Sequence, residues 1–553
     1  MQIFYTAILA LATSFLLMPL VIRLAERLNL VDKPGERKVH TTSIPRIGGV
    51  AVVAAFILPV LLFAPMTPVM KGILSGAIIV AIVGLLDDIL QLNAYAKFAG
   101  QAVAAGIGMA MSGLVINEID VFGIFKLDLG YFAYPFTLVW IVGITNAINL
   151  MDGLDGLAAG IVAIALFFLG LIGFLTNQYL ILFISATLFG ALLGFLKYNS
   201  HPAQVFMGDV GSLFLGFLVA MLTLIGSVRS AAVMTLALPL TILALPILDT
   251  AWAFTRRILK GTNPFSPDKK HIHHRLMNMG LGHGLTVMFM YGVATLLGLL
   301  GVFSVYQYEF RDISLFIVAA GMVAAALKLI AFIRRRPTLK HLFNKKVKPV
   351  PAGIMWLLRV TLLLPLIIRN LIIAALLMNV VLLVHTPVEG IIIGMILFGG
   401  ILYLYLTHQS DTYEQFLMFF LFLAGVFIIF AAEQVIDPVV WFESFSAEVF
   451  SNVLFSVIGV LIILNILVKQ ISGNFLSNPL EYFILLIVVC LNLLPPDLTM
   501  EYHLAAVSIK SIILFLGYRL LLEYHMQRSR RLIYVTLLVI AFTVGYSLVK
   551  LYV

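Results

Sequence analysis

Cysteine and charge are the two scarce ingredients of this sequence. Cys490 is the only cysteine among 553 residues, which excludes a disulfide framework and thiolate metal sites as organising features. Charged residues make up 11% of the chain and hydrophobic residues 62%, with a mean hydropathy of +1.09. A soluble globular protein carries more charge than this, so the composition indicates a protein built inside a membrane.

Apolar runs of about 20 residues recur along the whole chain, and each is long enough to cross a bilayer as a helix. We predict an all-α, polytopic membrane protein with about eleven spans in its first part and about seven more after it. The first apolar segment, Ile3 to Leu24, lacks a basic n-region and a small-residue cleavage pattern, so we expect it to be retained. The first set of spans is predicted at residues 3–25, 47–66, 71–90, 96–114, 132–150, 157–176, 179–197, 211–228, 231–255, 284–306 and 313–334.

Basic residues gather in four places, and their distribution orients the chain. The clusters are Lys33 to Arg46, Arg256 to Arg275, Arg334 to Lys348 and Arg528 to Arg531. Under the positive-inside rule these segments face the cytoplasm. Alternation of the spans from an outside N-terminus puts the acidic clusters described below on the same face. We therefore expect a multi-pass protein of the plasma (inner) membrane with a cytoplasmic site.

A basic, proline-containing linker separates the two groups of spans. We predict a membrane-embedded domain at residues 1–335, a cytoplasmic linker at 336–351 and a further helical membrane domain at 352–553. Spans of the last domain are expected at 357–384, 388–407, 414–432, 447–468, 479–496, 503–521 and 532–552. Its sequence holds no comparable carboxylate cluster, Gly-rich loop or histidine cluster, so it predicts no role beyond a helical membrane domain.

Three acidic clusters lie at the ends of predicted spans, where a carboxylate costs about 2.5–3.5 kcal/mol if it enters the hydrocarbon. They are Asp87 with Asp88, the stretch from Asn146 to Asp155, and the segment Phe206 to Ser212 around Asp209. The regular spacing of Asn149, Asp152 and Asp155 places several hard oxygens within two helical turns or a glycine-interrupted loop. Mg²⁺ takes such oxygens beside a diphosphate. The clusters therefore predict one phosphate-handling site.

Structural interpretations of the same acids stay open. Asp87 and Asp88 also fit a solvated helix end, and the stretch from Asn149 to Asp155 also fits a polar helix cap. Asp209 opens a predicted span, and a carboxylate near a helix N-terminus is favoured simply as a cap. The coincidence of the clusters on one face favours a functional site.

A fourth cluster is basic. The segment Asn263 to Arg275 holds His271, His273, His274 and Arg275, whose imidazole and guanidinium donors fit recognition of phosphates and sugar hydroxyls. The three histidines also allow a zinc site, although their spacing seldom closes a tetrahedral site from one segment. Lys38 and His40 add positive charge on the same face, with an ordinary positive-inside loop as the alternative.

Taken in order, these motifs resemble those of the polyprenyl-phosphate N-acetylhexosamine-1-phosphate transferases. The resemblance spans about residues 1–335, and the loop from Ser266 to Arg275 resembles the branch that uses UDP-N-acetylglucosamine. It implies an enzyme that transfers N-acetylglucosamine-1-phosphate from this nucleotide sugar to undecaprenyl phosphate and releases UMP. Members of the superfamily start cell-envelope glycans such as peptidoglycan, O-antigen lipopolysaccharide and teichoic acid linkage units.

The resemblance also implies roles for individual residues. It assigns catalytic roles to Asp87, Asp88, Asp152 and Asp155, and places Mg²⁺, or Mn²⁺ instead, on Asn149 and Asp209. Substrate-binding roles fall on Lys38, His40, Asn146, Asn199, His271, His273, His274 and Arg275. The implied partners are the UDP-sugar, the polyprenyl phosphate and the lipid bilayer, with no nucleic acid and with a homodimer as an open assembly state.

A transporter or flippase-like carrier of lipid-linked sugars is the main alternative, because many spans with buried carboxylates also describe ion-coupled carriers. The acids cluster at one membrane face and not near the midplane, which favours the enzyme. The second domain would then be a binding or scaffold module, or a flippase-like partner, that handles the lipid product.

Overall fold

The chain forms two compact units, residues 1–343 and 344–553. The computed structural model describes residues 2–32, 43–121, 125–229, 237–261, 271–278, 281–306, 321, 363–382, 384–406, 411–434, 440–442, 445–471, 503–522 and 530–552. Helices account for nearly all of this structure, and the strands form three short antiparallel pairs. The predicted all-α fold is confirmed.

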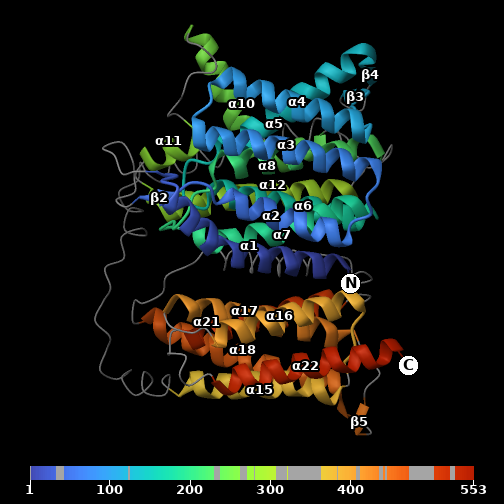
Figure 1. Ribbon diagram of the computed structural model, residues 1–553, viewed down its shortest axis with the longest axis vertical. Helices are drawn as coiled ribbons and strands as arrows, with labels where there is room; N and C mark the ends of the chain where they lie inside the picture. Colours follow the sequence, from blue (N-terminus) through green and yellow to red (C-terminus); the bar gives the residue numbers. More distant parts are fainter. Residues whose placement is uncertain are drawn as a thin grey trace. The chain divides into compact units, whose positions relative to one another are not determined.

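The first unit is a bundle of long helices that run back and forth (Figure 1). Its main helices are α1 (Gln2–Arg27), α2 (Gly49–Phe63), α3 (Pro68–Leu90), α4 (Ala94–Ser112), α5 (Ala133–Leu150), α6 (Leu157–Leu175), α7 (Tyr179–Asn199), α8 (Gly208–Arg229), α9 (Ala237–Ile242), α10 (Ala244–Leu259), α11 (Ile272–Asn278) and α12 (His283–Tyr306). The 3₁₀ turn η1 (Gly130–Phe132) leads into α5.

Two small hairpins mark opposite ends of this bundle. One pairs β1 (Val31–Asp32) with β2 (Ile44–Pro45), and the other pairs β3 (Glu118–Val121) with β4 (Phe125–Asp128). In Figure 1, β2 and α11 lie at one end of the helices, while β3 and β4 lie at the other. The bundle therefore has two distinct ends, and the acidic clusters all belong to the end with β2.

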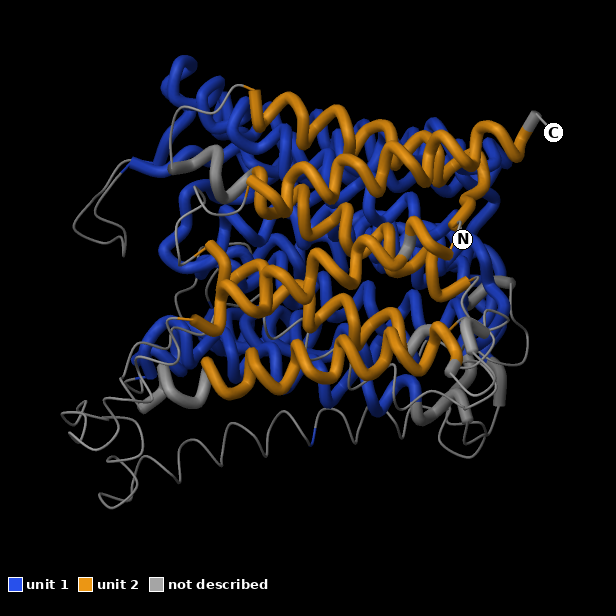
Figure 2. The backbone as a smooth tube through the Cα atoms, turned by 90° about the horizontal axis from the view of Figure 1, so that it is seen from below, with its two compact units in different colours: residues 1–343 blue, residues 344–553 orange. Residues whose placement is uncertain are grey.

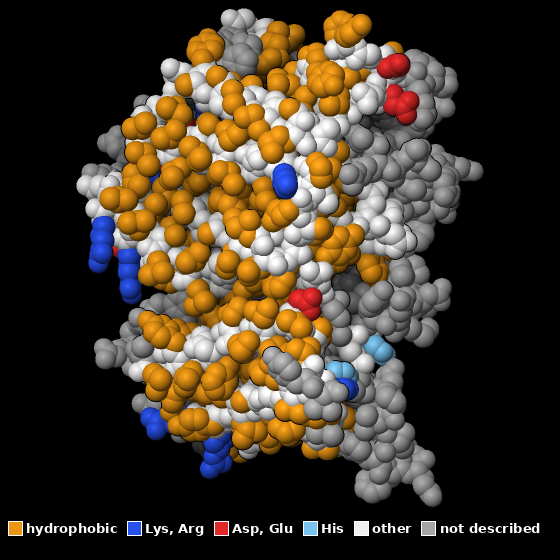
Figure 3. Space-filling model, turned by 45° about the vertical axis from the view of Figure 1, so that its right-hand side comes forward, with side chains coloured by type: hydrophobic (Ala, Val, Ile, Leu, Met, Phe, Trp, Pro, Cys, Tyr) orange, Lys and Arg blue, Asp and Glu red, His pale blue; other side chains and the backbone are white. Residues whose placement is uncertain are grey.

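Among the described residues, ten helices are long and apolar enough to cross a membrane, judged by length and composition. Hydrophobic side chains cover much of the face shown in Figure 3, and charged side chains are sparse there. The polytopic membrane architecture is therefore confirmed. The predicted spans 313–334 and 479–496 lie outside the described residues, apart from residue 321 in the first of them.

The prediction of one continuous helix at residues 231–255 is wrong. The described part of this range forms two helices, α9 and α10, which are separated at Leu243. Pro246 explains the break, because a proline ring clashes with the carbonyl four residues before it and has no N–H to donate. That carbonyl belongs to Ile242, the last residue of α9.

Helix α8 is the packing centre of the first unit. It packs against α3 and α5, and its side chains are almost wholly buried. A Cβ atom on Gly84 of α3 would lie 2.4 Å from the carbonyl oxygen of Asp209, so the two helices approach closely only because this residue is glycine. Trp140 of α5 donates from Nε1 to Thr223 Oγ1 at 2.9 Å. The first contact fixes the start of α8 against the end of α3, and the second joins the later part of α8 to α5.

The second unit is also helical, and its helices run side by side (orange in Figure 2). Its described elements are α15 (Leu364–Val381), α16 (Val388–Leu406), α17 (Asp411–Glu433), β5 (Val440–Phe442), β6 (Phe445–Ser446), α18 (Ala447–Ile471), α21 (Leu504–Leu522) and α22 (Arg530–Tyr552). A buried charge pair joins three of these helices. Lys510 Nζ of α21 lies 2.6 Å from Glu433 Oε1 of α17 and donates to Ser451 Oγ of α18 at 2.8 Å.

Replacing Glu433 by Gln should destabilise the protein by about 3–5 kcal/mol, because it leaves the buried ammonium of Lys510 without its counter-charge. Both side chains of the pair are only 3% exposed. The double variant Glu433→Gln/Lys510→Met should recover most of the loss, since no buried charge then remains. The free energy of unfolding, measured in mixed detergent micelles, tests this. Glu448→Gln on the exposed side of α18 is the control, and equal stability of Glu433→Gln and this control would show that the pair contributes nothing.

Candidate active site

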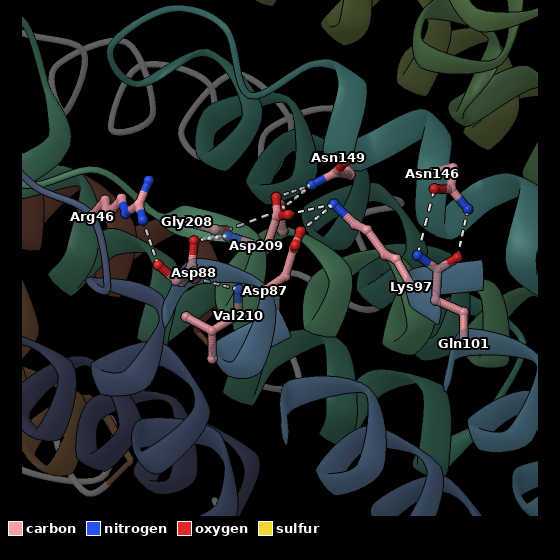
Figure 4. Close-up of polar contacts among 11 residues, drawn as sticks. Arg46, Asp87, Asp88, Lys97, Gln101, Asn146, Asn149, Gly208, Asp209 and Val210 are labelled. Atoms are coloured by element: carbon pink, nitrogen blue, oxygen red, sulfur yellow. Dashed lines mark hydrogen bonds and ion pairs between the residues drawn. The ribbon is translucent and has the colours of Figure 1, made fainter. Parts of the chain in front are cut away.

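The acidic clusters meet at the end of the first unit where several helices end and others begin. The C-terminal ends of α3, α5 and α7 lie beside the N-terminal ends of α4, α6 and α8. Polar side chains from α3, α4, α5 and α8 meet in this region (Figure 4). Residues far apart in the sequence therefore become neighbours because alternating helices return to the same end of the bundle.

Lys97 lies at the centre of this region, although the sequence analysis did not select it. From the first turn of α4, its Nζ lies 3.0 Å from Asp87 Oδ2 and also donates to Asp209 Oδ2. One ammonium thus joins two carboxylates from α3 and α8 (Figure 4). With one positive and two negative charges, the group carries a formal charge of −1, which attracts a further cation.

Asp88, the neighbour of Asp87, has a different environment. Its Oδ1 accepts from the backbone N–H of Asp209 at 3.1 Å, and its Oδ2 accepts from Val210 N at 3.0 Å. Asp88 therefore caps the N-terminus of α8 from another helix, where a carboxylate is stabilised by the helix dipole. Gly208 permits this approach, because it has a φ of +71° and a Cβ there would lie 2.6 Å from Asp88 Oδ2.

Arg46 binds the backbone at the C-terminal end of α3, next to the Asp88 side chain. Its Nη2 donates to the backbone oxygen of Asp88 at 2.5 Å, so the β2 segment is tied to the end of α3. The two members of the acidic pair thus differ: Asp87 faces Lys97, whereas both carboxylate oxygens of Asp88 are occupied by backbone donors.

Asp209 is not the cap that its position in the sequence allowed. Its carboxylate contacts Lys97 and accepts from Asn149 Nδ2 at 2.7 Å. Asn149 Nδ2 also donates to Ser212 Oγ at 2.8 Å. The carboxylates of Asp87 and Asp209 and the hydroxyl of Ser212 are oxygen donors, and a half-turn of the Asn149 amide group would present its oxygen in place of the nitrogen that now faces Asp209. Mg²⁺ and Mn²⁺ prefer oxygen donors, so the residues present fit the expected cation.

Asn146 is held by a second residue that the sequence analysis missed. Its Nδ2 donates to Gln101 Oε1 at 2.5 Å and to Val142 O at 2.8 Å, while Gln101 Nε2 donates back at 3.5 Å. Gln101 is buried in α4, one turn after Lys97. The sequence did hold a signal for Lys97 and Gln101, because they lie one turn apart on a helix whose other residues are mostly apolar.

Asp152 and Asp155 lie in the turn between α5 and α6. Burial raises the pKa of Asp152 to about 7, and the negative charges of Asp209, Asp88 and Asp155 add to the effect. Asp155 Oδ2 lies 2.7 Å from His201 Nδ1 and accepts from Ala203 N at 3.2 Å. The turn therefore holds one carboxyl group that exchanges a proton near neutral pH and one that is paired with an imidazole.

Asn199 lies beneath this turn, where it is buried. Its Oδ1 accepts from Gly156 N at 3.0 Å, and its Nδ2 donates to Val205 O at 2.9 Å. Both ends of the side chain are therefore bonded to backbone, so Asn199 joins the α5–α6 turn to the segment before α8.

The histidine segment packs against the same turn. His271 Nδ1 lies 2.9 Å from Asp249 Oδ2, and Asp249 Oδ1 accepts from Ile272 N at 2.9 Å, so α11 is anchored to α10. His273 is buried, and a Cβ atom on Gly153 would lie 2.6 Å from its Nε2. Burial lowers the pKa of His273 to about 4, so this imidazole is neutral at pH 7. Neither ring nitrogen has a hydrogen-bond partner among the described residues.

His274 and Arg275 are the more exposed members of this segment, with Arg275 on the surface. His274 stacks at an angle on His273, with 4.3 Å between ring centroids. Among the described residues, the group with metal-ligand geometry is Asp155, His201 and His283, and not the histidines of α11. Lys38 and His40 lie outside the described residues.

Comparisons with known proteins point to one family. The family model described as glycosyl transferase family 4 matches residues 70–227, which include Asp87 and Asp209. The chain is 40% identical over 348 residues to a probable undecaprenyl-phosphate N-acetylglucosaminyl 1-phosphate transferase of Bacillus subtilis, covering 62% of this chain and 93% of the relative.

More distant relatives carry similar names. A decaprenyl-phosphate N-acetylglucosaminephosphotransferase of Mycobacterium tuberculosis is 36% identical over 345 residues, covering 56% of this chain and 84% of the relative. An undecaprenyl-phosphate alpha-N-acetylglucosaminyl 1-phosphate transferase of Escherichia coli is 29% identical over 325 residues, covering 57% of this chain and 89% of the relative.

Removal of the Asp88 carboxylate should destabilise the protein more than removal of an exposed one. Asp88→Ala leaves the N–H groups of Asp209 and Val210 without their acceptor, which should cost about 1–3 kcal/mol. Asp88→Asn keeps an oxygen acceptor and should lose less. The free energy of unfolding measures the effect. The control is Asp128→Ala, because Asp128 is exposed and accepts one hydrogen bond from the nearby backbone N–H of Gly130. Equal losses of stability for the two alanine variants would contradict the capping role of Asp88.

Proposed function

The chain belongs to the polyprenyl-phosphate N-acetylhexosamine-1-phosphate transferases, and on this basis we propose that it transfers N-acetylglucosamine-1-phosphate from UDP-N-acetylglucosamine to undecaprenyl phosphate. An oxygen of the lipid phosphate attacks the β-phosphorus of the nucleotide sugar. The bond from this phosphorus to the bridging oxygen breaks, and UMP leaves. The products are undecaprenyl-diphospho-N-acetylglucosamine and UMP.

The observation that best supports this proposal is the convergence of Lys97, Asp87, Asp209 and Asn149 at one end of the helices. Both substrates are anions, so the reaction depends on positioning and charge neutralisation more than on covalent chemistry by the protein. The group's formal charge of −1 becomes +1 when a divalent cation is added. A cation-loaded site would therefore attract the diphosphate.

Asn149 and Asp209 would hold Mg²⁺, or Mn²⁺ instead, which when bound neutralises negative charge on the diphosphate and the leaving UMP. Two of the three N–H groups of Lys97 serve Asp87 and Asp209, and the third would donate to a phosphate oxygen. Without the ion, Asn149 keeps the Asp209 carboxylate oriented through its 2.7 Å hydrogen bond. Ser212 in turn holds the amide group of Asn149.

Asp152 is suited to proton transfer. A phosphate monoester loses its second proton near pH 6, so part of the lipid phosphate arrives protonated at neutral pH. A carboxyl group with a pKa of about 7 takes up such a proton and releases it again without a large free-energy cost. The sugar moiety would then meet His274 and Arg275, which are more exposed than His271 and His273.

We place the reaction at the cytoplasmic face of the plasma membrane. Arg27 ends α1 and Arg46 ties β2 to α3, so basic residues lie at the same end of the bundle as the acidic site. The positive-inside rule assigns that end to the cytoplasm. The polyprenyl chain would remain in the bilayer while its phosphate meets the soluble nucleotide sugar.

The purified chain should release UMP from UDP-N-acetylglucosamine only when undecaprenyl phosphate and Mg²⁺ or Mn²⁺ are present. A coupled UMP assay in detergent micelles measures the rate, and a panel of UDP-hexosamines defines the sugar. Excess EDTA should abolish the activity and added Mg²⁺ should restore it. Full activity in EDTA would exclude the metal role, and UMP release without lipid phosphate would indicate a hydrolase.

The same assay on residues 1–345 locates the chemistry within the chain. Every residue named in the mechanism belongs to the first unit, so we expect this shortened protein to remain active. A monodisperse, folded 1–345 protein without activity would show that the second unit completes the site.

A further inference from the structure

Three potential ligands converge from segments that are distant in sequence. Asp155 belongs to the turn before α6, His201 follows α7, and His283 begins α12. His201 Nδ1 lies 2.7 Å from Asp155 Oδ2, and His283 Nε2 lies 4.0 Å from the same oxygen. One ligand atom from each residue lies within 4.8 Å of the other two.

These distances are close to those of a tetrahedral metal site. Zinc bonds of about 2.0–2.1 Å in tetrahedral geometry place neighbouring ligand atoms about 3.3 Å apart. The observed separations of 2.7 Å and 4.0 Å lie on either side of this value. The third pair, the two histidine nitrogens, lies within 4.8 Å, so adjustments of the side-chain torsions would bring the three atoms onto one ion.

The donor types separate this cluster from the oxygen-rich site around Asp209. Two imidazoles and one carboxylate suit zinc and related transition metals, whereas Mg²⁺ prefers oxygen ligands. His283 Nε2 accepts from the backbone N–H of Asp155 at 3.2 Å, so this nitrogen is unprotonated and its lone pair faces Asp155. A bound ion would take that lone pair in place of the 3.2 Å hydrogen bond.

The surroundings hold the ligands in place. Ala203 N donates to Asp155 Oδ2 at 3.2 Å, which orients the carboxylate. Tyr291 of α12 donates to Gly156 O at 2.6 Å, so the turn and α12 are joined directly next to the ligands. The His201 and His283 rings stack with centroids 4.2 Å apart. The side chain of His201 is 50% exposed, which gives an ion a route from solvent.

We propose that Asp155, His201 and His283 form a second metal site, which binds Zn²⁺ and is separate from the Mg²⁺ site at Asn149 and Asp209. Three protein ligands leave a fourth position for water or for an oxygen of a bound anion. The ion would join the α5–α6 turn, the segment after α7 and the start of α12. It would also balance the charge of Asp155, one of the carboxylates that raise the pKa of Asp152.

Zinc binding by the full chain tests the proposal without any activity measurement. The protein is purified without a histidine tag, treated with chelator, and titrated with Zn²⁺ against a chromogenic zinc indicator in excess Mg²⁺. We expect one tightly held zinc per chain, confirmed by elemental analysis after gel filtration. His201→Gln and His283→Ala should lose this stoichiometric binding, while His385→Ala, an exposed histidine of the second unit, should keep it.

The Gln variant retains a hydrogen-bond donor toward Asp155, so the fold should survive; equal thermal midpoints for His201→Gln and the unchanged protein check this. Co²⁺ substitution gives a second readout, with the visible absorption of a four-coordinate ion expected only where His201 and His283 are intact. Failure of the unchanged protein to retain zinc would overturn the proposal. The contact between His201 and Asp155 would then be a hydrogen bond alone. Zinc that is lost in His274→Ala and kept in His201→Gln would also overturn it and place the ion on α11.

Discussion

The ammonium of Lys97 between the carboxylates of Asp87 and Asp209 is the interaction on which the candidate site depends. Three helix ends bring these charges together at the edge of an apolar bundle, where unpaired carboxylates would repel one another. One cation relieves this repulsion and leaves a formal charge of −1. A formal charge of −1 favours the approach of a further cation, as the proposed reaction requires.

The start of α8 connects these charges to the packing of the helices. The N-terminus of α8 points at Asp88, the side chain of Asp209 emerges from its first turn, and Gly84 lets α3 approach its backbone. Adjacent acids in the sequence thus perform different tasks, because Asp88 stabilises the helix end that presents Asp209 to Lys97. Within the pair of aspartates, Asp88 therefore has a structural role, while Asp87 belongs to the charged group around Lys97.

Much of this could be predicted from the sequence, because composition and apolar runs report directly on membrane helices. The acidic clusters were recognisable because carboxylates are rare in such a chain. Lys97 and Gln101 were missed because a single polar residue on an apolar helix gains meaning only from its partners in space. The sequence also could not show which residue caps α8. Asp209 stands at the start of this helix and was the candidate, yet the cap comes from Asp88 on α3. Pro246, which ends the helix before it, was present as a signal but was outweighed by the continuous hydropathy of residues 231–255.

A double-mutant cycle on Lys97 and Asp87 tests most directly whether these charges act as one unit. The variants are Lys97→Met, Asp87→Asn and their combination, with kcat/KM for UMP release measured at saturating Mg²⁺. Each single change should lower kcat/KM by about 10²-fold or more, because it unbalances the charge at the reacting phosphates. The double variant should be little worse than the poorer single variant, a coupling of about 0.5–3 kcal/mol. Losses that simply multiply, or near-normal turnover in Lys97→Met, would contradict a site organised around Lys97.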